Sequence, residues 1–182
     1  MRIRPADRAD APAIAAIYAH WVERTVVTFD VEAPSVTEWE RRLADAAEHR
    51  HPVLVGCEDG ENGAVVGYAA VSAWKPKPAY RWSVENSVYL APSAVGGGRG
   101  RALLERLITA TRDAGFRQIV ALVADAGSPA SLVLHRSLGF VTVGRMRRIG
   151  HKHDRWIDVD VLQLDLTPGP GPHPGPRERR TV

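Results

Sequence analysis

With 182 residues, 45% hydrophobic and 25% charged, and a formal net charge of +3, the chain predicts one globular domain without the basic stripe that binds nucleic acid. Its single cysteine, Cys57, excludes an internal disulfide framework and a multi-cysteine metal site. No apolar run reaches 18 residues and the charged N-terminus has no signal-peptide core, so we expect a cytoplasmic protein without a membrane span.

Apolar periodicity and turn residues divide the chain into strands and helices. In chain order they predict a strand over 2–4, helices over 9–23 and 35–50, strands over 52–58, 64–74 and 82–92, a helix ending near 114, a strand over 118–124, a helix over 128–140, and strands over 141–149 and 155–166. This order is typical of an α/β fold with a mixed, mostly antiparallel sheet and helices on both faces. The Pro/Gly-rich tail over 167–182 is predicted to be disordered, which leaves one domain over 1–166.

Polar residues that precede helical segments are predicted to cap them, namely Asp10, Ser35 and Ser128. Turns are expected over 59–63 and over 150–154, where they would join neighbouring strands. The wholly apolar strand over 118–124 is expected near the centre of the sheet.

Four glycines within five positions separate the strand over 82–92 from the next helix. The first N–H groups of a helix have no internal partner and its dipole adds positive charge, so such an end binds anions, and glycine lets a phosphate approach. A Walker loop is excluded because Arg101 and Ala102 follow Gly100 where that loop has a lysine and a hydroxyl residue, and the mid-chain position disfavours a Rossmann site. The sequence therefore predicts a pyrophosphate cradle made of Gly96, Gly97, Gly98, Arg99, Gly100 and Arg101.

The segments "VYLAPSAVGGGRGRALLERL" and "SPASLVLHRSLGF" resemble the Gcn5-related N-acetyltransferase (GNAT) superfamily. Within it, "WKPKPAYRWSVENSVYL" and "GHKHDRWIDVDVLQLDL" resemble phosphinothricin N-acetyltransferases, and the resemblance covers about residues 2–166. It implies the GNAT fold, acetyl-CoA as co-substrate and no metal. Its implied coenzyme contacts are the backbone of Val88, Tyr89 and Leu90, the glycine cradle, and Ser128 and Ser131. Val95 stands where the family signature has Gln or Arg, so one side-chain contact is missing.

Acetyl transfer to an amine needs a base, because an alkylammonium has a pKa near 10. Strand alternation places Glu85, Ser87 and Tyr89 on one face, and Glu85 matches the family's catalytic glutamate. His135 holds the family's aromatic or histidine position, which implies that it protonates the CoA thiolate; Tyr89 is a second donor, and a packed structural histidine is the other interpretation. Cys57 is predicted to be an inert buried thiol, so transfer would be direct, in a ternary complex.

The resemblance implies a small amino-acid acceptor such as phosphinothricin, methionine sulfone or methionine sulfoximine, and hence herbicide resistance. Its implied acceptor site comprises Phe29, Trp74, Lys75, Lys77, Tyr80, Trp156 and Val159. A homodimer is also implied, with no nucleic-acid or membrane partner. His151 and His153 lack a third metal ligand. Two alternatives stay open, an acetyltransferase with another acceptor (another small amine or a protein N-terminus) and a non-catalytic CoA sensor.

Overall fold

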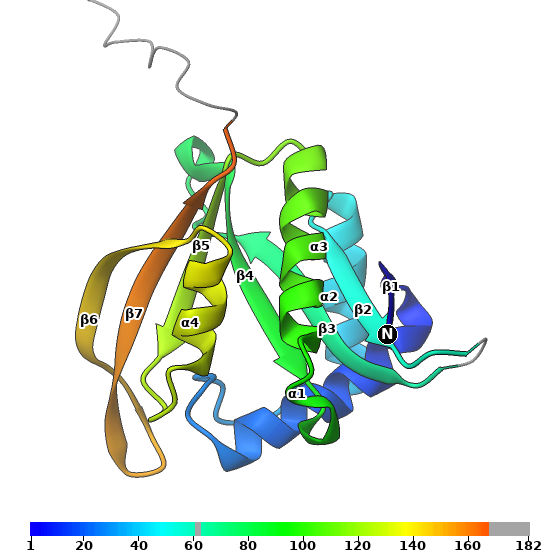
Figure 1. Ribbon diagram of the computed structural model, residues 1–182, viewed down its shortest axis with the longest axis horizontal. Helices are drawn as coiled ribbons and strands as arrows, with labels where there is room; N and C mark the ends of the chain where they lie inside the picture. The colour runs from blue at the N-terminus through cyan, green and yellow to red at the C-terminus, as the bar shows by residue number, and fades with distance from the viewer. Residues whose placement is uncertain (61–62, 168–182) are drawn as a thin grey trace, which may run out of the picture.

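The computed structural model describes residues 1–60 and 63–167, so the predicted tail and part of the predicted turn over 59–63 lie outside the described residues. Its elements in chain order are β1 (Arg2–Pro5), η1 (Arg8–Asp10), α1 (Ala11–Arg24), α2 (Val36–Glu48), β2 (Val53–Cys57), β3 (Val65–Ala73), η2 (Pro78–Tyr80), β4 (Ser83–Leu90), η3 (Pro92–Ala94), α3 (Arg99–Asp113), β5 (Gln118–Ala124), α4 (Ala130–Ser137), β6 (Val141–Lys152) and β7 (Arg155–Asp165). Figure 1 shows their arrangement. None of the described helices is long and apolar enough to cross a bilayer.

The sheet has seven strands in the order β1-β2-β3-β4-β5-β7-β6. All neighbours are antiparallel except β4 and β5, which run parallel. The predicted mixed, mostly antiparallel α/β fold is therefore confirmed, and β5 lies inside the sheet as expected. The parallel contact is short: it covers Ser83–Gln118, Val84–Ile119 and Glu85–Val120 and then ends. Beyond it the two strands diverge (Figure 1).

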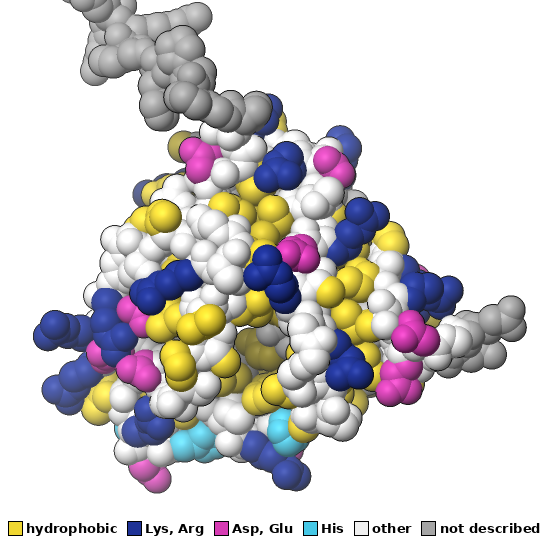
Figure 2. Space-filling view, in the orientation of Figure 1, with side chains coloured by type: hydrophobic (Ala, Val, Ile, Leu, Met, Phe, Trp, Pro, Cys, Tyr) yellow, Lys and Arg dark blue, Asp and Glu magenta, His cyan; other side chains and the backbone are white. Residues whose placement is uncertain are grey.

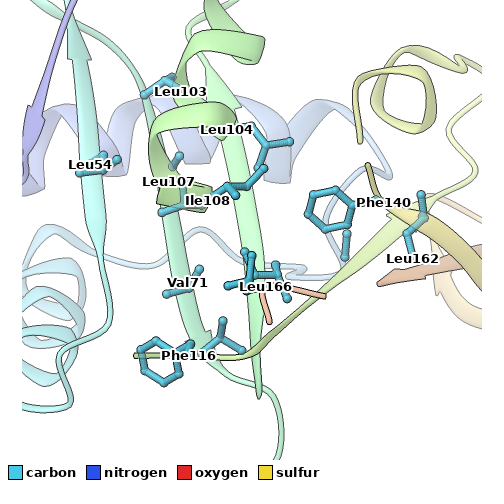
Figure 3. Close-up of a cluster of buried hydrophobic side chains, with 14 of the residues drawn as sticks. Leu54, Val71, Leu103, Leu104, Leu107, Ile108, Phe116, Phe140, Leu162 and Leu166 are labelled. Carbon is cyan, nitrogen blue, oxygen red and sulfur yellow. The ribbon is translucent and has the colours of Figure 1, made fainter. Parts of the chain in front are cut away.

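Helices α3 and α4 cover one face of the sheet, and α1 and α2 cover the other (Figure 1). On the first face, Leu103, Leu104 and Leu107 of α3 are fully buried against β-strand side chains (Figure 3). Burial of each such leucine contributes about 1.5–3 kcal/mol. On the second face, Tyr18 of α1 and Trp39 of α2 pack edge to face, with ring centroids 5.5 Å apart. Two separate cores thus lie on opposite faces of the sheet.

Two of the three predicted helix caps need correction. The Asp10 carboxylate does not cap α1; it accepts two bonds from Arg4, each of 2.7 Å, so it anchors β1 to the helix. The hydroxyl of Ser128 accepts a bond from Ala130 N–H at 3.3 Å, but Pro129 holds the N-cap position. Ser35 caps α2 as predicted, through a 3.2 Å bond from Glu38 N–H.

The last hairpin is tighter than the sequence suggested. Strand β6 continues through Lys152, and the turn before β7 consists only of His153 and Asp154. Both have positive φ, 49° and 56°, as a two-residue type I′ turn requires. Gly150 and Lys152 therefore belong to the strand, and strand alternation puts both of them on the same face of the hairpin.

Candidate active site

The divergence of β4 from β5 leaves one edge of β4 without a strand partner. Ala91 N–H bonds to Val66 O of β3 at 2.8 Å, and this fixes the alternation of backbone groups along β4. The backbone of Tyr89 therefore faces β3, while that of Val88 and Leu90 faces the gap. This alternation favours the predicted coenzyme contacts through the backbone of Val88 and Leu90 over the one through Tyr89, which stays a prediction. The Leu90 carbonyl also accepts a 2.8 Å bond from the Trp21 indole N–H, so Val88 is the more open of the two.

The N-terminus of α3 lies directly after this open edge. Gly96, Gly97 and Gly98 have positive φ of 93°, 58° and 76°, a conformation that residues with side chains rarely adopt. A Cβ on Gly96 or Gly98 would meet open space, so this loop is bare backbone. Ala102 N–H bonds to Gly98 O at 3.0 Å and Arg99 N–H to Gly96 O at 3.4 Å, while the N–H groups of Gly100 and Arg101 between them have no carbonyl partner in the described residues. The arrangement fits a diphosphate group.

The two arginines of this loop are already engaged. Arg101 pairs with Glu105 at 2.9 Å and donates to Ser137 Oγ of α4 at 2.9 Å, so it links α3 to α4. Arg99 Nη1 donates to Ala94 O at 3.4 Å, and Val95 is exposed. The backbone therefore supplies the main anion-binding groups. Figure 2 shows the surface hollowed between α3 and α4, with apolar side chains at its floor.

Glu85 lies where the two strands separate, on the sheet face covered by α1 and α2. The β3 register pairs it with Ser72, and Ser87 and Tyr89 follow on the same face. Burial raises the pKa of the Glu85 carboxyl above its ordinary value, and the Lys75 ammonium opposes that shift. A carboxylate with a raised pKa binds a proton more readily than an ordinary one, which favours a role as general base.

A cavity of about 190 Å³ opens on this same face, between α2 and strands β3 and β4. Trp39, Ser72, Ser87 and Tyr89 are among its lining residues. Burial raises the pKa of Tyr89 to about 12, with Asp30 and Glu85 adding to the shift, so this hydroxyl keeps its proton. The cavity combines aromatic walls with hydroxyl groups.

The loop between α1 and α2 closes this side of the site through a buried polar network. The Tyr18 hydroxyl contacts Thr28 Oγ1 and donates to Asp30 Oδ2 at 2.9 Å. Lys152, from the end of β6, donates from Nζ to Thr28 O at 3.0 Å. Lys152 is 6% exposed, and burial lowers its pKa while Asp30 opposes the shift. The β6–β7 hairpin and the α1–α2 loop are therefore held together by one buried ammonium.

Phe29 joins the same contact through its ring. It packs so closely on Gly150 of β6 that a Cβ at Gly150 would overlap the ring. Phe29 remains 41% exposed, so part of the ring is left to face a ligand. The predicted acceptor residue Phe29 thus depends on the hairpin for its position.

His135 is buried on the other face, with both ring nitrogens engaged. Nδ1 lies 2.8 Å from Ser131 O, which can only accept, so Nδ1 carries the proton. Nε2 lies 3.0 Å from Asn86 Nδ2 and therefore accepts from it. Burial lowers the His135 pKa, so the ring is neutral and has no proton to give at Nε2. This geometry favours the structural interpretation of His135, and its role as an acid stays a prediction.

The remaining predicted residues are dispersed. Lys75 lies over the Trp74 ring, 4.6 Å from its centroid, while Lys77 and Tyr80 are exposed in the same loop. The β6–β7 register places buried Val159 on the face of Gly150 and Lys152, but Trp156 on the opposite face, 55% exposed. Cys57 is buried, and Ser131 reaches the site only through His135. Within residues 1–60 and 63–167, no group of three His, Cys, Asp or Glu side chains could hold a metal.

Sequence reasoning missed Asn86 and the network of Tyr18, Thr28, Asp30 and Lys152. Asn86 could have been found, because alternation puts it opposite Glu85 on a strand that is otherwise apolar on that face. Lys152 lies two residues after Gly150, but the strand was expected to end at residue 149, so no role was predicted for this lysine.

The family model described as an acetyltransferase (GNAT) domain matches residues 3–161. A phosphinothricin N-acetyltransferase of Alcaligenes faecalis is 42% identical over 154 residues, 85% of this chain and 77% of the relative. An L-methionine sulfoximine/L-methionine sulfone acetyltransferase of Salmonella typhimurium is 39% identical over 167 residues, 90% of this chain and 94% of the relative. A Sinorhizobium meliloti phosphinothricin acetyltransferase solved with acetyl-CoA superposes with a TM-score of 0.84, at 39% identity over 90% of this chain and 87% of that one.

Proposed function

The chain belongs to the GNAT acetyltransferase family, and we propose that it transfers the acetyl group of acetyl-CoA to the amino group of a small amino-acid analogue. The observation that carries the proposal is the divergence of β4 from β5 at Glu85, beside a glycine-rich helix N-terminus. In this proposal the half-buried Glu85 carboxylate, the open edge of β4 and the diphosphate cradle follow one another in the chain, from β4 to the start of α3. The named activities of the relatives support an acceptor of the phosphinothricin and methionine sulfone type.

The roles of the residues follow from their faces. The first-turn N–H groups of α3 bind the diphosphate, and the free edge of β4 at Val88 binds the amide arm. Acetyl-CoA supplies the thioester. Glu85, on the opposite face, takes the proton of the acceptor ammonium. The Tyr89 hydroxyl, which keeps its proton, lies on the same face as Glu85 and is the proton donor for the departing CoA thiolate. Because Cys57 is buried in β2, away from Glu85, attack is direct and no acyl-cysteine forms.

The acceptor is proposed to be small and anionic. The cavity of about 190 Å³ beside Ser87 suits an amino-acid side chain better than an aminoglycoside. Lys75, near Glu85, supplies a cation for a carboxylate or a tetrahedral oxygen. Resistance to phosphinothricin would follow from its acetylation, and a cytoplasmic location stays a prediction.

An acceptor screen with acetyl-CoA and detection of released thiol tests the function. We expect phosphinothricin, methionine sulfone or methionine sulfoximine to give a kcat/KM at least about a hundredfold above spermidine, an aminoglycoside or an alanine-initiated peptide, because the Lys75 cation and a small cavity select the amino-acid class. A peptide or polyamine as the best acceptor would contradict the proposed substrate. Coenzyme binding without turnover on any amine would favour a sensor instead.

We also propose that the protein is a homodimer. Strand β6 is an edge of the sheet, and the apolar side chains of Leu122, Val141 and Val143 on β5 and β6 are 36%, 61% and 54% exposed. Exposed apolar side chains beside an edge strand are typical of a protein interface. We expect light scattering to give twice the single-chain mass of 19.9 kDa. Val143→Glu should shift the protein towards the mass of one chain. A wild-type protein of single-chain mass at micromolar concentration would refute the dimer.

A further inference from the structure

The side chain of Asn86 lies at the point where β4 and β5 separate. Glu85 is the last β4 residue paired with β5, and Asn86 follows it, with its side chain on the α3/α4 face. Its amide nitrogen is bound to His135 Nε2 of α4 at 3.0 Å. This bond crosses from the sheet to the helix at the narrow end of the space between the two strands.

The amide oxygen of Asn86 has no partner. Asn86 is 7% exposed, and its Oδ1 is a buried side-chain atom without a hydrogen bond in the described part of the chain. The amide cannot turn over to remove the problem. His135 Nδ1 donates to Ser131 O, so Nε2 must accept, and only the Asn86 nitrogen can donate to it. His135 therefore fixes Oδ1 as the group left over, and an unsatisfied buried acceptor costs about 1–3 kcal/mol.

The missing partner must be a hydrogen-bond donor that comes from between the strands. The backbone of β3 already pairs with the other edge of β4, opposite Asn86 at Val71. A thioester carbonyl cannot serve, because it only accepts. The pantetheine arm of CoA offers two amide N–H groups, and the one nearer the sulfur would be the closer to Glu85 when the thioester is in place.

We propose, on the basis of the proposed function, that Asn86 is a coenzyme-binding residue whose Oδ1 accepts a hydrogen bond from the pantetheine amide nearest the sulfur. His135 is then a positioning residue, which holds the Asn86 amide in the accepting orientation. This assignment gives a use to the neutral, fully bonded His135 ring. It also explains why a polar side chain stands among the apolar residues Val84 and Val88 on this face.

Calorimetric binding of CoA and of 3′,5′-ADP, which has the phosphates but no pantetheine arm, tests the proposal without turnover. Asn86→Leu is expected to weaken CoA binding about tenfold, the loss of one buried hydrogen bond, and to leave 3′,5′-ADP binding unchanged. Asn86→Gln keeps both the N–H that His135 Nε2 accepts and an acceptor oxygen, so it is the conservative control and is expected to lose less CoA affinity than Asn86→Leu.

A ligand change separates this contact from a displaced helix. A CoA analogue with an ester oxygen in place of the amide N–H nearest the sulfur should bind wild type about tenfold more weakly than CoA does. Asn86→Leu should bind the analogue and CoA equally well, because the acceptor oxygen is already missing. Equal binding of both ligands to wild type, or a further tenfold loss in the variant, would overturn the proposal. Failure of wild type to bind CoA at all would instead overturn the proposed function, and this contact with it.

Discussion

Glu85→Gln is expected to acetylate its acceptor about a thousandfold more slowly than wild type at pH 7. An alkylammonium with a pKa near 10 is neutral in only about one molecule per thousand at that pH. Glutamine fills the same space beside Ser72 but cannot take a proton, so only that neutral fraction would react. Removal of a general base commonly costs about 10²–10⁴-fold, which agrees with this figure. CoA binding should be unchanged, because the cradle and the open strand edge lie on other residues.

The pH profile gives the sharper measurement. Burial raises the pKa of Glu85, so the wild-type kcat/KM should fall only as the pH drops through that raised value and should be level above it up to the pKa of the amine. In Glu85→Gln the rate should rise about tenfold per pH unit across the same range, because it follows the neutral amine. A variant whose profile stays parallel to wild type would exclude Glu85 as the base.

Much of the fold could be predicted because its signals are local. Helix periodicity, the glycine loop and the cap at Ser35 each depend on a few neighbouring residues. The errors arose where tertiary contacts competed with local preference. Asp10 has the chemistry of a cap, but Arg4 offers it two charged bonds. The segment over 150–154 looks like a loop, yet Phe29 needs the flat surface of a strand glycine at Gly150.

The sequence allowed the functional residues on one strand to be predicted, but not the contacts between residues far apart in the chain. Alternation along β4 could place Glu85 and Tyr89 on one face, because that property is periodic. It could not show that His135 would meet Asn86, which is 49 residues away in the chain. It also could not show that Lys152 would bond the backbone of residue 28, since a contact over 124 residues depends on how the hairpin packs.

On the proposed function, strand β4 separates the two halves of the reaction. Its α3/α4 face carries Asn86 and leads to the diphosphate cradle, while its α1/α2 face carries Glu85 and Tyr89. The donor and the acceptor would therefore approach from opposite sides and meet where β5 has moved away. Substitutions on one face should change the KM of one substrate and leave that of the other unchanged.

Lys152→Met is the strongest test of this separation. Methionine has a similar length and fits a buried site, but it leaves Thr28 O without its donor and Asp30 without a nearby cation. The α1–α2 loop, which carries Phe29, would then be held less firmly against the hairpin. We expect the KM of the acceptor to rise about thirtyfold, equivalent to about 2 kcal/mol, and the KM of acetyl-CoA to change less than twofold.

Gly150→Ala should also raise the KM of the acceptor and leave the KM of acetyl-CoA nearly unchanged, because it disturbs the contact of the hairpin with Phe29. Its methyl group would overlap the Phe29 ring and push the loop away from β6, although the Lys152 ammonium is still present. Arg155→Met is the matched control, since Arg155 stands in the same hairpin but is exposed and its side chain donates, among the described residues, to Asp125 O alone, so both KM values should be kept. If Lys152→Met and Gly150→Ala fold normally and keep the acceptor KM, the hairpin does not position the loop. If both KM values rise together, Lys152 supports the whole fold and not the acceptor side of β4.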